Sequence, residues 1–155
     1  MTTQDHLPHS NIDHGDQAAA ANIRITRRFF DDVLVRQRGP AMDEVIAPGA
    51  VIDLPTGRFT GPEGVRAAST RLRSIFPDLR VEVKDLIAAG NQVVVIWQLC
   101  GTQQRELFGV PPTGRRECSS ALSQLRIENN MIVEHQMTEG EASPEGSGPD
   151  RFAKI

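Results

Sequence analysis

Residues 76–102, FPDLRVEVKDLIAAGNQVVVIWQLCGT, decide the fold. Leu79, Val81 and Val83 alternate with charged residues, a pattern that predicts a half-buried strand. Residues 91–103 are apolar at both alternating positions, so they predict a central strand that is covered on both sides. The middle of the chain is therefore expected to form part of a sheet.

Helical patterns come before these strands. In residues 18–37, Ile23, Phe30 and Val33 recur at helical spacing, and Gly39-Pro40 ends this helix. Residues 41–48 predict a short helix closed by Pro48, and residues 50–55 predict a short strand. A third helix is predicted over residues 60–78, and Pro77 stops it. Its apolar stripe is formed by Val65, Ala68, Leu72 and Phe76.

The remaining elements are a loop and two strands. Residues 108–116 contain two prolines and two glycines and predict a loop, whereas 117–127 and 131–139 predict strands joined at Asn129-Asn130. Helices come first and antiparallel strands last, which predicts an α+β domain with its helices on one face of a curved sheet. We expect a polar tail over residues 1–17, the domain over 18–140 and a flexible tail over 141–155.

The bulk properties exclude several classes of protein. The chain of 155 residues has a net charge of -3 without basic clusters, so no nucleic-acid partner is expected. It has no apolar run that could span a bilayer, and we expect no signal peptide and a cytoplasmic protein. Cys100 and Cys118 could form one bridge or stay reduced. His6, His9 and His14 could bind a metal ion, but a solvated tail is the simpler interpretation.

The register of the last hairpin decides where His135 points. A two-residue loop would place Gln124 beside His135, whereas a three-residue loop with a left-handed Asn130 and a bulge would place Ser123 there. The second register separates apolar from polar residues better, and hydrophobic pattern fixes register. It predicts an inward His135 across from Ser123. It also pairs Met137 with Ala121 and Glu139 with Ser119.

Three segments carry a resemblance to a known family: residues 76–102, ELFGVPPTGRR at 106–116 and LRIENNMIVEH at 125–135. Together with the order of elements, they resemble the SnoaL-like polyketide cyclases of the nuclear transport factor two-like superfamily over about residues 18–139. The resemblance implies a cone-shaped barrel, in which a curved, mostly antiparallel sheet wraps around the N-terminal helices and encloses an apolar pocket. Family cyclases close a ring of an aromatic polyketide by aldol chemistry without metal or cofactor. Relatives act in hydroxylation, epoxide opening or pyran formation.

The resemblance also implies a catalytic carboxylate on the last strand, and Met137 occupies its position. A thioether cannot transfer a proton. We therefore expect His135, whose ordinary pKa suits acid/base catalysis, to be the reacting group. Asp53 is a second candidate, because burial in an apolar cone would raise its pKa. Glu139, two residues beyond Met137 on the same face, could replace the lost carboxylate.

Candidate substrate-binding residues surround these groups. Trp97 is expected to form the pocket floor, and Arg105 could bind an anionic group at the mouth. The full set is Trp97, Met137, Ser123, Ala121, Phe30, Phe76, Phe108, Leu99 and Arg105. For Trp97, plain core packing is an equally good interpretation, and Phe30, Phe76 and Phe108 could be pocket lining or core. The sequence has no metal-ligand cluster, phosphate loop or dinucleotide fingerprint, so we expect no cofactor.

Two functions remain open from the sequence. The first is a cofactor-free enzyme of specialised metabolism, a cyclase or isomerase acting on an apolar polycyclic molecule. The second is a non-catalytic binding protein or an accessory protein of a biosynthetic oxygenase, since Met137 replaces the family carboxylate. Val94 and Ile96 on the outer face of the sheet predict a homodimer, because they would otherwise expose apolar surface.

Overall fold

The computed structural model describes the backbone of residues 9–140 and 143–144, and side chains from Gln17 to Gly140. Its helices are α1 (His9–Arg28), the π-helix η1 (Phe29–Val35) that follows it directly, α2 (Gly39–Val45) and α3 (Gly61–Ile75). α1 begins within the segment predicted as a tail, and the predicted tail boundaries stay predictions. His6, His9 and His14 lie outside the residues whose side chains are described.

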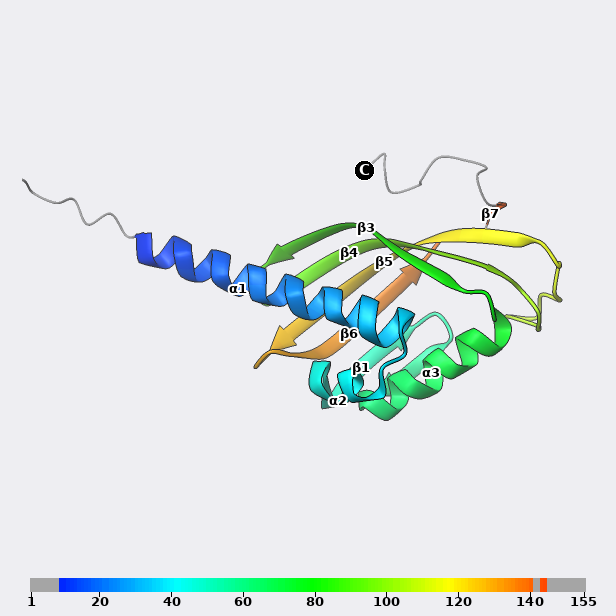
Figure 1. Ribbon diagram of the computed structural model, residues 1–155, viewed down its shortest axis with the longest axis horizontal. Coiled ribbons are helices and arrows are strands. Elements are labelled where there is room, and N and C mark those ends of the chain that lie inside the picture. The colour runs from blue at the N-terminus through cyan, green and yellow to red at the C-terminus, as the bar shows by residue number, and fades with distance from the viewer. Residues whose placement is uncertain (1–8, 141–142, 145–155) are drawn as a thin grey trace, which may run out of the picture.

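One curved sheet carries the remaining elements. Its strands are β1 (Ile46–Leu54), β2 (Gly57–Thr60), β3 (Arg80–Ala89), β4 (Gln92–Thr102), β5 (Arg116–Glu128), β6 (Met131–Glu139) and the short β7 (Ser143–Pro144). The strand order is β2-β1-β6-β5-β4-β3, and β7 pairs with β5. Only β1 and β6 among these pairs run parallel. The helices lie on one face of the sheet (Figure 1). The α+β prediction is confirmed, with a sheet that does not close between β2 and β3.

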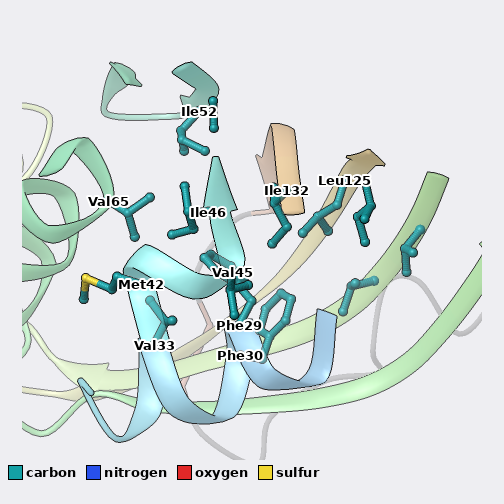
Figure 2. Packing of buried hydrophobic residues seen from close by; sticks show 14 of the residues in the cluster. Phe29, Phe30, Val33, Met42, Val45, Ile46, Ile52, Val65, Leu125 and Ile132 are labelled. Atoms are coloured by element: carbon teal, nitrogen blue, oxygen red, sulfur yellow. The ribbon is translucent and has the colours of Figure 1, made fainter. Parts of the chain in front are cut away.

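The core forms where η1 meets the sheet. Phe29, Phe30 and Val33 of η1 are almost completely buried and belong to one core cluster with Leu125 and Ile132 of the sheet (Figure 2). A π-helix has more residues per turn than an α-helix, so the two adjacent phenylalanines and Val33 can all point towards the sheet. Arg73 of α3 donates hydrogen bonds to the carbonyl oxygens of Leu34 and Val35, which η1 leaves free at its end.

One prediction of local structure is wrong, and one alternative left open by the sequence now has an answer. The helix predicted to close at Pro48 ends at Val45, because Ile46 already pairs with Ile132 and begins β1. The pairing of the two cysteines, which the sequence left open, is a disulfide bond between Cys100 and Cys118, directly opposite each other on β4 and β5.

A cytoplasmic location stays a prediction. Among the described helices, none is both long and apolar enough to cross a membrane.

The last hairpin has the predicted faces with a different register. Asn129 and Asn130 both have positive φ and form a two-residue turn. A bulge at Val133 then shifts the pairing, so that Leu125 lies opposite His135 and Ser123 lies opposite Met137. The predicted pairing of His135 with Ser123 is therefore wrong by two residues. A shift of two residues preserves the side of the sheet, and His135 still faces inward.

Candidate functional site

An apolar cavity lies between α3, η1 and the inner face of the sheet. Its volume is about 90 Å³, and its wall includes the exposed residues Pro55, Arg71 and Glu139. The wall is mostly aliphatic and aromatic. Its members are Phe29, Leu34, Ile52, Leu54, Pro55, Thr56, Val65, Ala68, Ser69, Arg71, Leu72, Ile75, Leu79, Val81, Trp97, Leu99, His135, Met137 and Glu139.

His135 is the most buried titratable group of this wall. Only 3% of the residue is exposed, and the ring of Phe29 meets the imidazole edge-on at a centroid distance of 5.5 Å. Strand β1 runs beside it and places Ile52 at the same level. Desolvation by these apolar neighbours lowers the pKa of His135 from its usual 6.5 to about 4. The imidazole is therefore neutral at neutral pH.

A short chain of polar groups lies behind the cavity wall. The indole nitrogen of Trp97 donates to Ser123 Oγ at 2.9 Å, and Ser123 Oγ lies 2.8 Å from His135 Nε2. Ser123 is fully buried, and it reaches His135 diagonally because the two residues are not direct strand partners. The other ring nitrogen, His135 Nδ1, is buried without a hydrogen-bond partner. Buried polar atoms rarely lack a partner, and this marks His135 Nδ1 as a candidate contact for a bound molecule.

Several predicted site residues lie in the cavity wall. Trp97 and Leu99 come from β4, and Met137 and Glu139 follow His135 at alternate positions of β6. Glu139 accepts a hydrogen bond from Ser119 Oγ at 2.5 Å and is an exposed residue of the cavity wall. At the usual rise of a strand, Glu139 is about 13 Å from His135 along β6. One aromatic ring cannot contact both groups.

Asp53 lies on the other face of the sheet from this cavity. In β1 it follows the inward-facing Ile52, and Arg58 of β2 donates to both of its carboxylate oxygens, at 2.6 and 3.1 Å. The predicted rise in its pKa is wrong. The hydrogen bond from Arg58 lowers the pKa of the Asp53 carboxyl, with a smaller contribution from the charge of Arg58.

The other predicted residues lie behind the wall or away from it. Ser123, Ala121 and Phe30 are buried in the core and do not line the cavity. Phe76 caps the end of α3, Arg105 is exposed, and Phe108 is 66% exposed in the loop after β4. These three residues are not part of the cavity wall among the described residues.

Sequence reasoning missed most of the α3 side of the cavity. The stripe of Val65, Ala68 and Leu72 was predicted as buried but not as cavity wall. Phe29 was missed because a regular helix would have turned it away from Phe30. Arg71 carried no sequence signal. In residues 17–140, no three His, Cys, Asp or Glu side chains are grouped as a metal site requires.

Comparisons with known proteins agree with this architecture. The family model for SnoaL-like polyketide cyclases matches residues 24–144. A candidate SnoaL-like polyketide cyclase from Jannaschia sp. CCS1 superposes with a TM-score of 0.70 at 24% identity, covering 88% of this chain and 90% of its own. No curated protein matches the chain.

Two Streptomyces structures are also similar. IdmH, a candidate polyketide cyclase from Streptomyces antibioticus, has a TM-score of 0.65 at 26% identity and covers 76% of this chain and 91% of its own. AclR, a candidate hydroxylase from Streptomyces galilaeus, has a TM-score of 0.65 at 21% identity and covers 79% and 90%. The same fold is thus shared by proteins with different assigned reactions.

Proposed function

Because this chain belongs to the SnoaL-like polyketide cyclase family, we propose that it is a cofactor-free enzyme that performs acid/base chemistry on an apolar, polyketide-like molecule. One observation carries the proposal: a buried titratable side chain, His135, lines an apolar cavity with one ring nitrogen left without a partner. Cavities of this kind, with few polar groups in an apolar wall, are typical of small-molecule sites.

The cavity limits what such a substrate can look like. Its volume of about 90 Å³ is below the range of about 300–1,000 Å³ usual for drug-sized ligands. A polycyclic molecule would therefore place one ring at His135 and extend through the mouth past Met137 and Glu139. Ring closure, isomerisation or epoxide opening each need one proton-transferring group in a site without water, and His135 would supply it.

The test is turnover by His135 variants. Compounds that co-purify with the protein or raise its melting temperature are incubated with it, and products are identified by mass spectrometry. We expect His135→Gln to lower turnover about 100-fold or more, as is usual for loss of a general acid or base. Gln136→Ala, which changes the exposed neighbour on the opposite face, is the control and should keep full activity. Undiminished turnover by His135→Gln would remove this residue from the mechanism.

A second function is favoured by Met137. The resemblance predicts a carboxylate at this position, and the structure places the thioether in the cavity wall instead. The low pKa of His135 makes its neutral form a weak base. Both observations also suit a protein that binds a small molecule without converting it, such as an accessory protein of an oxygenase. Tight binding of a co-purifying compound, with no product after prolonged incubation, would favour this function.

A homodimer is part of the proposal. On the outer face of the sheet, Ile87 pairs with Val94 and Ile96 pairs with Leu122, and Ile87 is 56% exposed. A second copy of the chain would cover this apolar surface. We expect light scattering after size-exclusion chromatography to give twice the mass of the chain, and Ile96→Glu to give a monomer. Gln104→Glu, in the exposed loop after β4, should stay dimeric. A monomeric parent protein at every concentration would contradict the dimer.

A further inference from the structure

The hydrogen positions in the Trp97–Ser123–His135 chain follow from which atoms can donate. An indole N–H can only donate, so Ser123 Oγ accepts from Trp97. The serine hydroxyl then keeps one hydrogen of its own. Among the described residues, His135 Nε2 is the one remaining atom within hydrogen-bond distance of that hydroxyl. If the hydroxyl donates to Nε2, the imidazole hydrogen must be on Nδ1.

The tautomer with its hydrogen on Nε2 leaves more buried polar groups without a hydrogen-bond partner. With the hydrogen on Nε2, Ser123 Oγ would accept from both Trp97 and His135, and its hydroxyl hydrogen would have no acceptor. Nδ1 would then be a second buried atom without a partner. With the hydrogen on Nδ1, only the Nδ1–H donor is unmatched. Each unmatched buried polar group is costly, so the chain favours the Nδ1–H tautomer.

We propose that Trp97 and Ser123 are positioning residues that hold His135 with its hydrogen on Nδ1, and that this N–H donates a hydrogen bond to the carbonyl oxygen of an aromatic ketone bound in the cavity. The proposal deepens the proposed function and rests on it for the place of the ligand. It requires no proton transfer. The hydrogen bond polarises the carbonyl and adds selectivity for a ketone over the equivalent hydrocarbon.

A neutral oxygen suits this donor better than an anion does. The wall residues around the imidazole, such as Phe29 and Ile52, are apolar, and the one cation in the cavity wall, Arg71, is exposed. An anion buried at His135 would have no charged partner and would lose its hydration. A ketone has a smaller desolvation cost and offers lone pairs for a single N–H.

The first test reads the tautomer directly in the unmodified protein. Histidine labelled with ¹⁵N shows by NMR which ring nitrogen carries the hydrogen. We expect Nδ1–H for His135 between pH 6 and 8. Ser123→Ala should release the ring to the Nε2–H form or to a mixture, and Ser123→Thr, which retains a hydroxyl, should restore Nδ1–H. A hydrogen on Nε2 in the unmodified protein would overturn the proposal, whether or not the protein shows turnover.

The second test measures the hydrogen bond to a ligand. Acetophenone and α-methylstyrene have nearly the same shape, and only acetophenone has an acceptor oxygen. We expect the ratio of their dissociation constants, measured by calorimetry, to favour acetophenone about tenfold more in the parent protein than in His135→Gln, which lacks Nδ1. An unchanged ratio, or no binding of acetophenone up to its solubility, would overturn the donor role. If His135→Gln does not fold, the same comparison with Ser123→Ala should show a reduced preference, and an unchanged one counts against the proposal. Absence of turnover alone bears on the proposed enzyme and not on this hydrogen bond.

Discussion

Gly61→Ala is expected to lower the free energy of unfolding by about 3 kcal/mol, the size expected of a steric clash added to backbone strain. Gly61 begins α3 with a φ of +65°, a conformation that side chains disfavour. An added Cβ would also lie 2.4 Å from the carbonyl oxygen of Pro48 in β1. Backbone must therefore move, and α3, which supplies one wall of the cavity, must separate from β1.

Two other glycines separate these causes. Gly90 has a φ of +60° and open space around its Cβ position, so Gly90→Ala should cost only about 1 kcal/mol for the conformation. Gly49 has neither a positive φ nor a neighbour within 4 Å, and Gly49→Ala should change stability by less than about 0.5 kcal/mol. Urea unfolding of the three variants provides the measurement. Equal losses for Gly61→Ala and Gly90→Ala would show that the approach of Gly61 to Pro48 does not matter.

The protein is also expected to lose about 3 kcal/mol of stability between pH 7 and pH 4 through His135 alone. Folding lowers the pKa of this fully buried side chain from 6.5 to about 4. Above pH 6.5 the imidazole is neutral in both the folded and the unfolded chain, so it adds no pH dependence to the free energy of unfolding. Below 6.5 the unfolded chain binds a proton that the folded chain does not, so stability falls as the pH decreases to about 4. The size follows from about 1.4 kcal/mol for each unit of pKa.

Urea unfolding at several pH values between 4 and 7.5 measures this loss. The His135→Gln variant should be less stable at pH 7, but its free energy of unfolding should change much less between pH 4 and pH 7.5. Asp53 and Asp78 also have lowered pKa values, through hydrogen bonds from Arg58 and Thr102. Most of their contribution to stability is lost below pH 4, under the window assigned to His135. A slope that is the same in both proteins would show that another group is responsible.

The sequence predicted which side of a strand a residue lies on better than it predicted which residue pairs with it on the next strand. Alternation along β6 correctly turned His135 inward, because the side of a strand depends only on whether a position is odd or even. The partner of His135 depends on where a bulge lies, and both Asn129 and Asn130 adopt positive φ, which removes the three-residue loop on which the prediction relied. The apolar Ile132 is fully buried because the bulge at Val133 changes the alternation there.

Other parts of the site could not have been predicted from local patterns. Asp53 was expected to face the pocket, but its direction is fixed by the parallel pairing of β1 with β6, which joins distant parts of the chain. Phe29 lines the cavity because η1 is a π-helix, and an ideal helical repeat does not reveal that change. The loop that contains Phe108 has no periodicity, so the exposure of its aromatic ring had no sequence signal.

The parallel contact between β1 and β6 has a consequence for biosynthesis. Ile52 and His135 are neighbours in the sheet but are separated by about half of the chain. On the ribosome, the N-terminal helices and β1 emerge long before β6 has been translated, and a contact of such high sequence separation forms late in folding. Until then, β1 can pair only with β2, and the apolar side chains of β1 and η1 that pack against the later strands are exposed to chaperones and to other nascent chains. The imidazole is thus shielded from water only after β6 has been synthesised.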